Sequence, residues 1–130
     1  MRWRILVVDD DPTVLEVVKA VLTADGFQVE VAEDGSAALR RILDAPPALV
    51  VLDVNMPDLN GWELCDIVRR QSHTRDVPIL FLTGRSDAAD RITAMQVGGS
   101  DHLQKPFGTE ELRNRVRALA RDLPRIKDRR

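Results

Sequence analysis

The chain has 130 residues, the usual size of one domain, which is long enough to build a hydrophobic core without disulfides or metal staples. Hydrophobic residues make up 44% and charged residues 31%, which excludes a disordered class, and no apolar run approaches the length of a membrane span. The apolar stretch near the N-terminus is too short for a signal peptide, so we expect a cytoplasmic protein. The single cysteine, Cys65, excludes an internal disulfide and is expected to be a buried hydrophobe.

The net charge of -2 conceals opposite charges at the two ends of the chain. Residues 1–112 carry 11 basic and 19 acidic side chains, whereas residues 113–130 carry 8 basic and 2 acidic ones. A basic end can attract nucleic acid or an anionic surface. A helix with a solvated arginine face that leads into a linker is the interpretation we favour.

Four segments have the composition of β-strands, and a shorter fifth follows them: residues 3–9, 27–32, 48–53, 78–83 and 101–104. The first, third and fourth are nearly continuous apolar runs, which are typical of strands covered on both faces. The second alternates Phe27, Val29 and Val31 with polar residues, which predicts one exposed face. This mixture favours a parallel sheet.

Helical patterns follow each strand. The first is set by Val14, Leu15 and Val18, and Asp25 with Gly26 predicts its end. The others are expected at residues 35–44, 61–71, 87–97 and 109–122.

Polar residues at the helix starts support these boundaries. Asp11 is expected to cap the first helix because Pro12 suits the first helical position. Asp34 or Ser36 is expected to start the second helix, and Asn60 the third. The last opens at Thr109, followed by two acids that the helix dipole favours.

The order of elements is a strand–helix pair repeated five times. Such alternation predicts an α/β protein with a doubly wound parallel sheet between two helical layers, because the crossovers are right-handed. Functional residues of such folds lie in the crevice beyond the carboxyl ends of the strands.

Reactive polar side chains end, or directly follow, four of the predicted strands: Asp9 and Asp10, Asp53, Thr83, and Lys105. Carboxylates crowded into one crevice repel one another, and a divalent cation relieves the repulsion. All-oxygen ligands suit Mg²⁺ better than Zn²⁺. Asp53 is then a nucleophile toward phosphorus, with Thr83 and Lys105 as partners for phosphoryl oxygens, which indicates acyl-phosphate formation.

Four motifs occur in order at these strand ends: "ILVVDDDP", "LDVNMPDLNG", "FLTG" and "HLQKPF". Together they resemble the receiver domain of two-component response regulators over residues 3 to 122. The resemblance implies a flavodoxin-like three-layer (βα)5 sandwich with strand order 2-1-3-4-5. It also implies a receiver domain at residues 1–122 and, at residues 123–130, a basic tail or the start of a linker to an output domain.

The resemblance assigns roles within the site. Asp53 would accept a phosphoryl group from a histidine kinase or phosphotransfer protein. Asp10 would bind Mg²⁺ directly, Asp9 through water, and the main-chain carbonyl of Asn55 would be a further ligand. No enzyme activity is implied beyond self-phosphorylation from small donors and slow loss of the phosphoryl group.

Thr83 and Lys105 would hold the phosphoryl oxygens, and the Lys105–Pro106 peptide bond is expected to be cis. In the loop after Asp53, Met56 and Pro57 shape the chain and Gly61 permits a close approach. Asp58 is expected to be a turn former.

Two residues depart from the family pattern. His102 stands where an aromatic residue is common, which raises the question of pH sensitivity, although a partly exposed histidine on an edge strand is the simpler interpretation. Gly84 replaces the commoner alanine and is expected to loosen its loop. Asn55 and Arg85 are expected to tune the phosphoryl lifetime.

The face formed by the fourth helix, the fifth strand and the fifth helix resembles a charged dimerisation face, with Asp90, Arg91, Asp101, Glu111 and Arg115. A phosphorylation-dependent homodimer is expected there, with no direct nucleic acid or membrane binding by this chain. Two alternatives remain: an interaction module that works without phosphorylation, and an aspartyl-phosphate phosphatase.

Overall fold

The computed structural model describes residues 3–84, 88–121 and 123. Over these residues, strands and helices alternate as predicted. The strands are β1 (Arg4–Val8), β2 (Gln28–Ala32), β3 (Leu49–Asp53), β4 (Ile79–Thr83) and β5 (Asp101–Gln104). The helices are α1 (Pro12–Ala24), α2 (Gly35–Asp44), α3 (Gly61–Arg70), α4 (Ala88–Gln96) and α5 (Thr109–Arg121). The first four strands begin one residue later than the sequence pattern predicts, a difference within the usual uncertainty of element ends.

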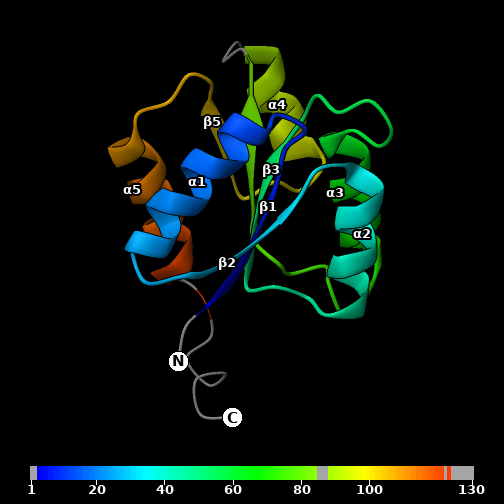
Figure 1. Ribbon diagram of the computed structural model, residues 1–130. Coiled ribbons are helices and arrows are strands. Elements are labelled where there is room, and N and C mark those ends of the chain that lie inside the picture. Colours follow the sequence, from blue (N-terminus) through cyan, green and yellow to red (C-terminus); the bar gives the residue numbers. More distant parts are fainter. Residues whose placement is uncertain (1–2, 85–87, 122, 124–130) are drawn as a thin grey trace.

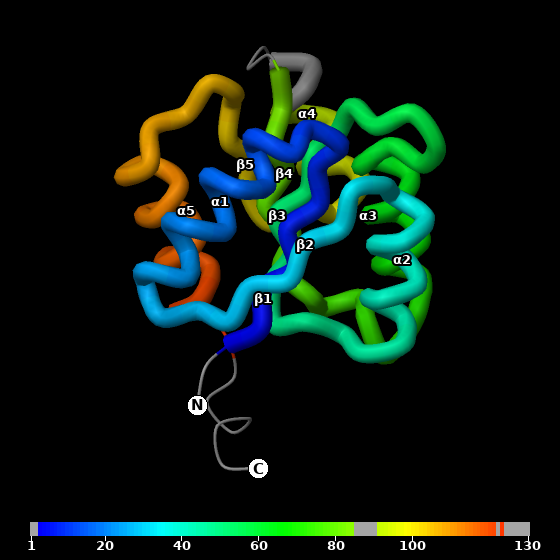
Figure 2. Tube along the Cα trace, in the orientation of Figure 1, coloured from blue at the N-terminus to red at the C-terminus, as the bar shows by residue number. Residues whose placement is uncertain are grey.

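The sheet is parallel with the order β2-β1-β3-β4-β5, which confirms the predicted topology. Helices α1 and α5 cover one face, and α2, α3 and α4 cover the other (Figure 1). The loops that follow the carboxyl ends of the strands gather along one edge of the sheet, at the top of Figure 2. No helix in the described part of the chain is long and apolar enough to cross a membrane.

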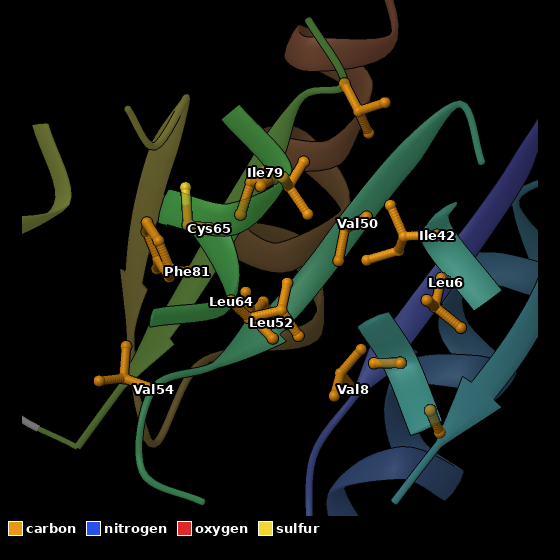
Figure 3. Close-up of a cluster of buried hydrophobic side chains, with 14 of the residues drawn as sticks. Leu6, Val8, Ile42, Val50, Leu52, Val54, Leu64, Cys65, Ile79 and Phe81 are labelled. Atoms are coloured by element: carbon orange, nitrogen blue, oxygen red, sulfur yellow. The ribbon is translucent and has the colours of Figure 1, made fainter. Parts of the chain in front are cut away.

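The two faces of the central strands supply two separate cores. Leu6 and Val8 of β1 face α2 and α3, whereas the alternate residues Ile5 and Val7 face α1 and α5. Figure 3 shows the first of these cores, where Cys65 lies buried as predicted. Each large apolar side chain removed from water contributes about 1.5–3 kcal/mol, so continuous apolar runs are required in strands covered on both faces.

The edge strand β2 has the half-exposed character that its alternation predicts. Val29 and Val31 are partly buried against the core of α1 and α5. On the other face, Gln28 is exposed and Glu30 pairs with Arg4 at 3.3 Å.

The predicted N-caps position the helices at the functional edge. The Asp11 side chain accepts a hydrogen bond from the Thr13 N–H, and Asp34 accepts one from Ala37. Asn60 forms a capping box at the start of α3. These bonds satisfy N–H groups that the first turn of a helix leaves free, so they fix where each helix leaves its loop.

Arg69 holds together the edge of the domain opposite to these loops. Its Nε donates to the Gly98 carbonyl at 2.8 Å, and its Nη1 donates to the carbonyls of Arg75 and Val77 at 2.9 and 2.7 Å. One side chain of α3 therefore fixes both the segment before β4 and the turn after α4.

Arg69→Ala is expected to lower the free energy of unfolding by about 2–4 kcal/mol, because two part-buried carbonyls, those of Val77 and Gly98, lose the guanidinium as a donor. Arg70→Ala is the matched control, since Arg70 pairs only at the surface with Asp66 at 3.1 Å and should cost about 0–0.5 kcal/mol. Urea unfolding of both variants measures the difference. Equal losses would contradict the anchoring role of Arg69.

Candidate functional site

Two adjacent acids follow β1 and differ in environment. Asp9 is fully buried, and its Oδ1 accepts a hydrogen bond from the Asp11 N–H at 2.9 Å. Asp10 is exposed. The end of β1 thus presents one fixed carboxylate and one that solvent reaches.

Asp53 is the last residue of β3 and is only 3% exposed. Carboxylate oxygens of Asp9, Asp10 and Asp53 all lie within 4.8 Å of one another. β1 and β3 are hydrogen-bonded neighbours, so the topology itself brings these acids together. The group offers only oxygen donors, which is the ligand set of a hard divalent cation.

Lys105 links two of these acids. Its Nζ lies 2.8 Å from Asp9 Oδ2, as an ion pair without hydrogen-bond alignment, and donates to Asp53 Oδ1 at 3.2 Å. The Lys105 N–H also donates to the Thr83 carbonyl at 2.6 Å, and the Lys105–Pro106 peptide bond is cis as expected. The loop after β5 is therefore joined to β4 and places the ammonium group among the acids.

The charged groups in this site shift one another's pKa values. Burial, reinforced by the charge of Asp9, raises the pKa of Asp53 to about 6, while Lys105 opposes the shift. Burial disfavours the charge of Lys105, but Asp9 and Asp53 together outweigh it and raise the pKa of the lysine. The buried acids therefore favour a cation in their midst.

Thr83 ends β4, the strand beside β3, and lies at the same edge of the sheet as Asp53. Its Oγ1 is buried and has no hydrogen-bond partner among the described residues. A Cβ added at the next residue, Gly84, would meet nothing within 4 Å, so this side of the site is open. A buried hydroxyl without a hydrogen-bond partner lowers the stability of the free protein. We therefore infer that the Thr83 hydroxyl forms a hydrogen bond with a ligand.

The loop between β3 and α3 is closed tightly beside Asp53. The Gly61 N–H donates to the Val54 carbonyl at 2.9 Å, and a Cβ at Gly61 would lie 2.7 Å from the Asp53 carbonyl oxygen. Met56 is buried in the core. The backbone N–H of Asn55 lies close enough to the Asp53 carboxylate to lower its pKa, so the Asn55 peptide lies against the site.

Sequence reasoning missed the partner of Asp58. Instead of only forming a turn, its carboxylate accepts hydrogen bonds from the N–H groups of Gly35 and Ser36 in α2, at 3.2 and 3.1 Å. No sequence pattern gave this contact, because its acceptor and donors are 22 and 23 residues apart and the donors are backbone groups.

Other predicted positions lie on β5 and α5. His102 is partly buried on the edge strand β5, and its Nε2 has no partner among the described residues. Nearby, Asp101 pairs with Arg115 at 2.9 Å, and Glu111 lies 3.9 Å from the same arginine. The predictions for Arg85 and for the side chain of Asp90 lie outside the described residues.

Comparison with known proteins decides the family. The family model described as the response regulator receiver domain matches residues 5–117. This chain belongs to that family. The receiver domain is similar to the DNA-binding response regulator MtrA of Mycolicibacterium smegmatis, with 43% identity over 121 residues. It is 48% identical over 121 residues to the response regulator MprA of Mycobacterium sp. strain KMS.

Each alignment covers 93% of this chain and 52% of the relative, so the receiver domain spans about half the length of the curated relatives it matches. Among solved structures, a response regulator from Chloroflexus aurantiacus has a TM-score of 0.87 at 37% identity, covering 92% of this chain and 98% of that one. The chemotaxis protein CheY4 of Vibrio cholerae also has a TM-score of 0.87, at 33% identity, with 92% and 99% covered.

Phosphorylation of an aspartate is the general function of this family, and receiver domains are not enzymes in the usual sense. The structure brings together the predicted Asp9, Asp10, Asp53 and Lys105, and Thr83 lies at the same sheet edge. The receiver domain therefore has its candidate residues at the edge where the parallel topology predicts them.

Proposed function

We propose that Asp53 accepts a phosphoryl group from a histidine kinase or phosphotransfer protein, and that the domain is the receiver of a two-component response regulator. The observation that carries the proposal is the arrangement around Asp53: a buried carboxylate with two further acids within 4.8 Å and a lysine ammonium 3.2 Å from its Oδ1. An ordinary surface aspartate is exposed to water and is not held among two further acids and a lysine.

The residues fit Mg²⁺ as the metal. Asp9, Asp10 and Asp53 offer carboxylate oxygens, and among the described residues the buried Asp9 Oδ2 has no aligned hydrogen-bond donor. The main-chain carbonyl of Asn55 would be a further ligand. When bound, Mg²⁺ supplies positive charge that neutralises the acids and the phosphoryl oxygens.

The chain's own residues carry the transfer step. A carboxylate oxygen of Asp53 forms a bond to phosphorus as the bond from phosphorus to the donor's imidazole nitrogen breaks, and the electron pair leaves with the imidazole. The Thr83 hydroxyl donates to one phosphoryl oxygen and Lys105 pairs with another. We further propose slow self-phosphorylation from small phosphodonors, and we propose that Asn55 and Arg85 tune the phosphoryl lifetime.

An apolar hollow beside the site suits the approach of the donor protein. It opens next to Lys105 and is lined in part by Val14 and Val17 of α1 and by Phe107. Val17 is 42% exposed, so this apolar side chain is accessible to a partner. We place the docking of the phosphodonor there.

The remaining proposals concern the whole protein. We propose that phosphorylation promotes a homodimer through α4, β5 and α5, that this chain itself contacts neither nucleic acid nor membrane, and that it acts in the cytoplasm. Residues 1–122 would form the receiver, and residues 123–130 a basic tail or the start of a linker. Asp101 and Arg115, which pair at 2.9 Å within the chain, are charged side chains on this face.

Incubation with acetyl phosphate, with Mg²⁺ or with a chelator, tests the central proposal. Mass spectrometry of the digested protein is expected to find the phosphoryl group on Asp53 and only when Mg²⁺ is present. A label on another residue, or labelling that chelation does not reduce, would contradict the proposed function.

A further inference from the structure

Asp58 connects the loop beside the acceptor to a different helix. Its Oδ1 accepts from the Gly35 N–H at 3.2 Å and its Oδ2 from the Ser36 N–H at 3.1 Å. These are the first two residues of α2, whose N–H groups have no partner within the helix. Each carboxylate oxygen thus has a separate donor, and the negative charge lies at the favourable end of the helix dipole.

The backbone contact at the same place is unusually close. A Cβ added at Gly35 would lie 2.2 Å from the Leu59 carbonyl oxygen and 2.8 Å from the Leu59 Cβ. Only glycine allows this approach. The Ser36 side-chain hydroxyl leads the contacts that hold the pKa of Asp58 well below its usual range, and the backbone N–H groups add to it, so the carboxylate stays ionised. Asp58 and Leu59 together fasten the loop to α2.

The fastened residues are close in the chain to the acceptor. The Asn55 N–H lies close enough to the Asp53 carboxylate to lower its pKa, and only two residues, Met56 and Pro57, separate Asn55 from Asp58. Met56 is buried and proline has a fixed φ, so this short segment has little freedom to absorb a shift. Movement of Asp58 would therefore reach the Asn55 peptide.

We propose that Asp58 is a positioning residue: by fastening the loop of residues 54–60 to the start of α2, it holds the Asn55 carbonyl where a metal ion among the acids can use it. This inference rests on the proposed function. Part of the receiver's affinity for the metal would then depend on a contact with α2, a helix that contains none of the three acids Asp9, Asp10 and Asp53.

Asp58→Ala tests this role against Asp34→Ala as the matched control. Asp34 caps the same helix, accepting from the Ala37 N–H at 2.7 Å, but it belongs to the segment before α2 and not to the loop. Both variants remove one carboxylate from the start of α2. Calorimetric titration with Mg²⁺ is expected to show about tenfold weaker binding for Asp58→Ala, the effect of losing a group that orients a ligand. Asp34→Ala should change the affinity by less than about twofold.

Each outcome of this comparison decides something. Wild-type Mg²⁺ affinity in Asp58→Ala, or equal weakening in both variants, overturns the positioning role. Failure of the wild-type protein to bind Mg²⁺ overturns the proposed function and this inference with it. If Asp58→Ala does not fold, Asp58→Asn replaces it: its amide oxygen keeps one of the two acceptors, and about threefold weaker Mg²⁺ binding is expected, with unchanged binding counting against the inference.

Hydrogen exchange gives a second readout that does not depend on phosphorylation. Because coupling between two sites is reciprocal, Mg²⁺ should strengthen the contact that helps to bind it. The Gly35 and Ser36 amides are therefore expected to exchange more slowly in wild-type protein when Mg²⁺ is added, and Asp58→Ala should abolish this response. If Mg²⁺ does not change these exchange rates in the wild type, the contact of Asp58 with α2 serves only the fold.

Discussion

Asp53→Asn is expected to abolish phosphorylation and, at the same time, to stabilise the metal-free protein. Burial and the charge of Asp9 raise the pKa of Asp53 from 3.8 to about 6. An acid whose pKa rises on folding contributes most to stability below its unfolded pKa, and that contribution is lost as pH rises through the folded value. At neutral pH the charged carboxylate therefore costs about 2–3 kcal/mol, which the neutral asparagine avoids.

Urea unfolding in the presence of a chelator measures this effect. The gain in the free energy of unfolding should be full above about pH 7 and small near pH 4, where the carboxyl of folded Asp53 is already protonated. Asp76→Asn, at an exposed position, serves as the control and should be neutral at both values. If Asp53→Asn is no more stable than the wild type at either pH, the acceptor is not held in an unfavourable charged state.

The fold was predictable because its signals are long and redundant. The apolar runs of β1, β3 and β4 require cover on both faces, and alternation with helices then leaves a parallel sheet. Parallel strands end at one edge, so Asp9, Asp53 and Thr83 were predicted to meet there without knowledge of any distance. Caps such as Asp11 and Asn60 were predictable because their partners lie two or three residues away.

The parts that escaped prediction depend on contacts between segments far apart in the sequence. Two adjacent acids, Asp9 and Asp10, look alike in sequence, yet one is buried against the lysine and the other faces solvent. The ion pair of Lys105 with Asp9 shows that the lysine already has a role before any phosphoryl group arrives. The contacts of Asp58 with α2 are made to N–H groups, which every residue except proline has, so the sequence carries no trace of them.

The double role of Lys105 leads to a prediction with two opposite signs. Lys105→Met is expected to slow phosphorylation of Asp53 by about 10² to 10³, because the ammonium group no longer stabilises the charge on the transferred phosphoryl group. The same change should tighten Mg²⁺ binding by about tenfold or more, because the ammonium lies 2.8 Å from Asp9 and 3.2 Å from Asp53 and so competes with a metal for these oxygens.

Measuring both the Mg²⁺ affinity and the phosphorylation rate distinguishes two roles of Lys105: competing with the metal for the carboxylates, or holding the carboxylates in place for it. Calorimetric titration gives the Mg²⁺ affinity, and the rate of labelling by acetyl phosphate at saturating Mg²⁺ gives the transfer step. Lys19→Met removes the same charge from an exposed position on α1 and should leave both nearly unchanged. If Lys105→Met weakens Mg²⁺ binding as well as phosphoryl transfer, the lysine holds the acids in place for the metal. The proposal that its ammonium group competes with Mg²⁺ for the carboxylates would then be wrong.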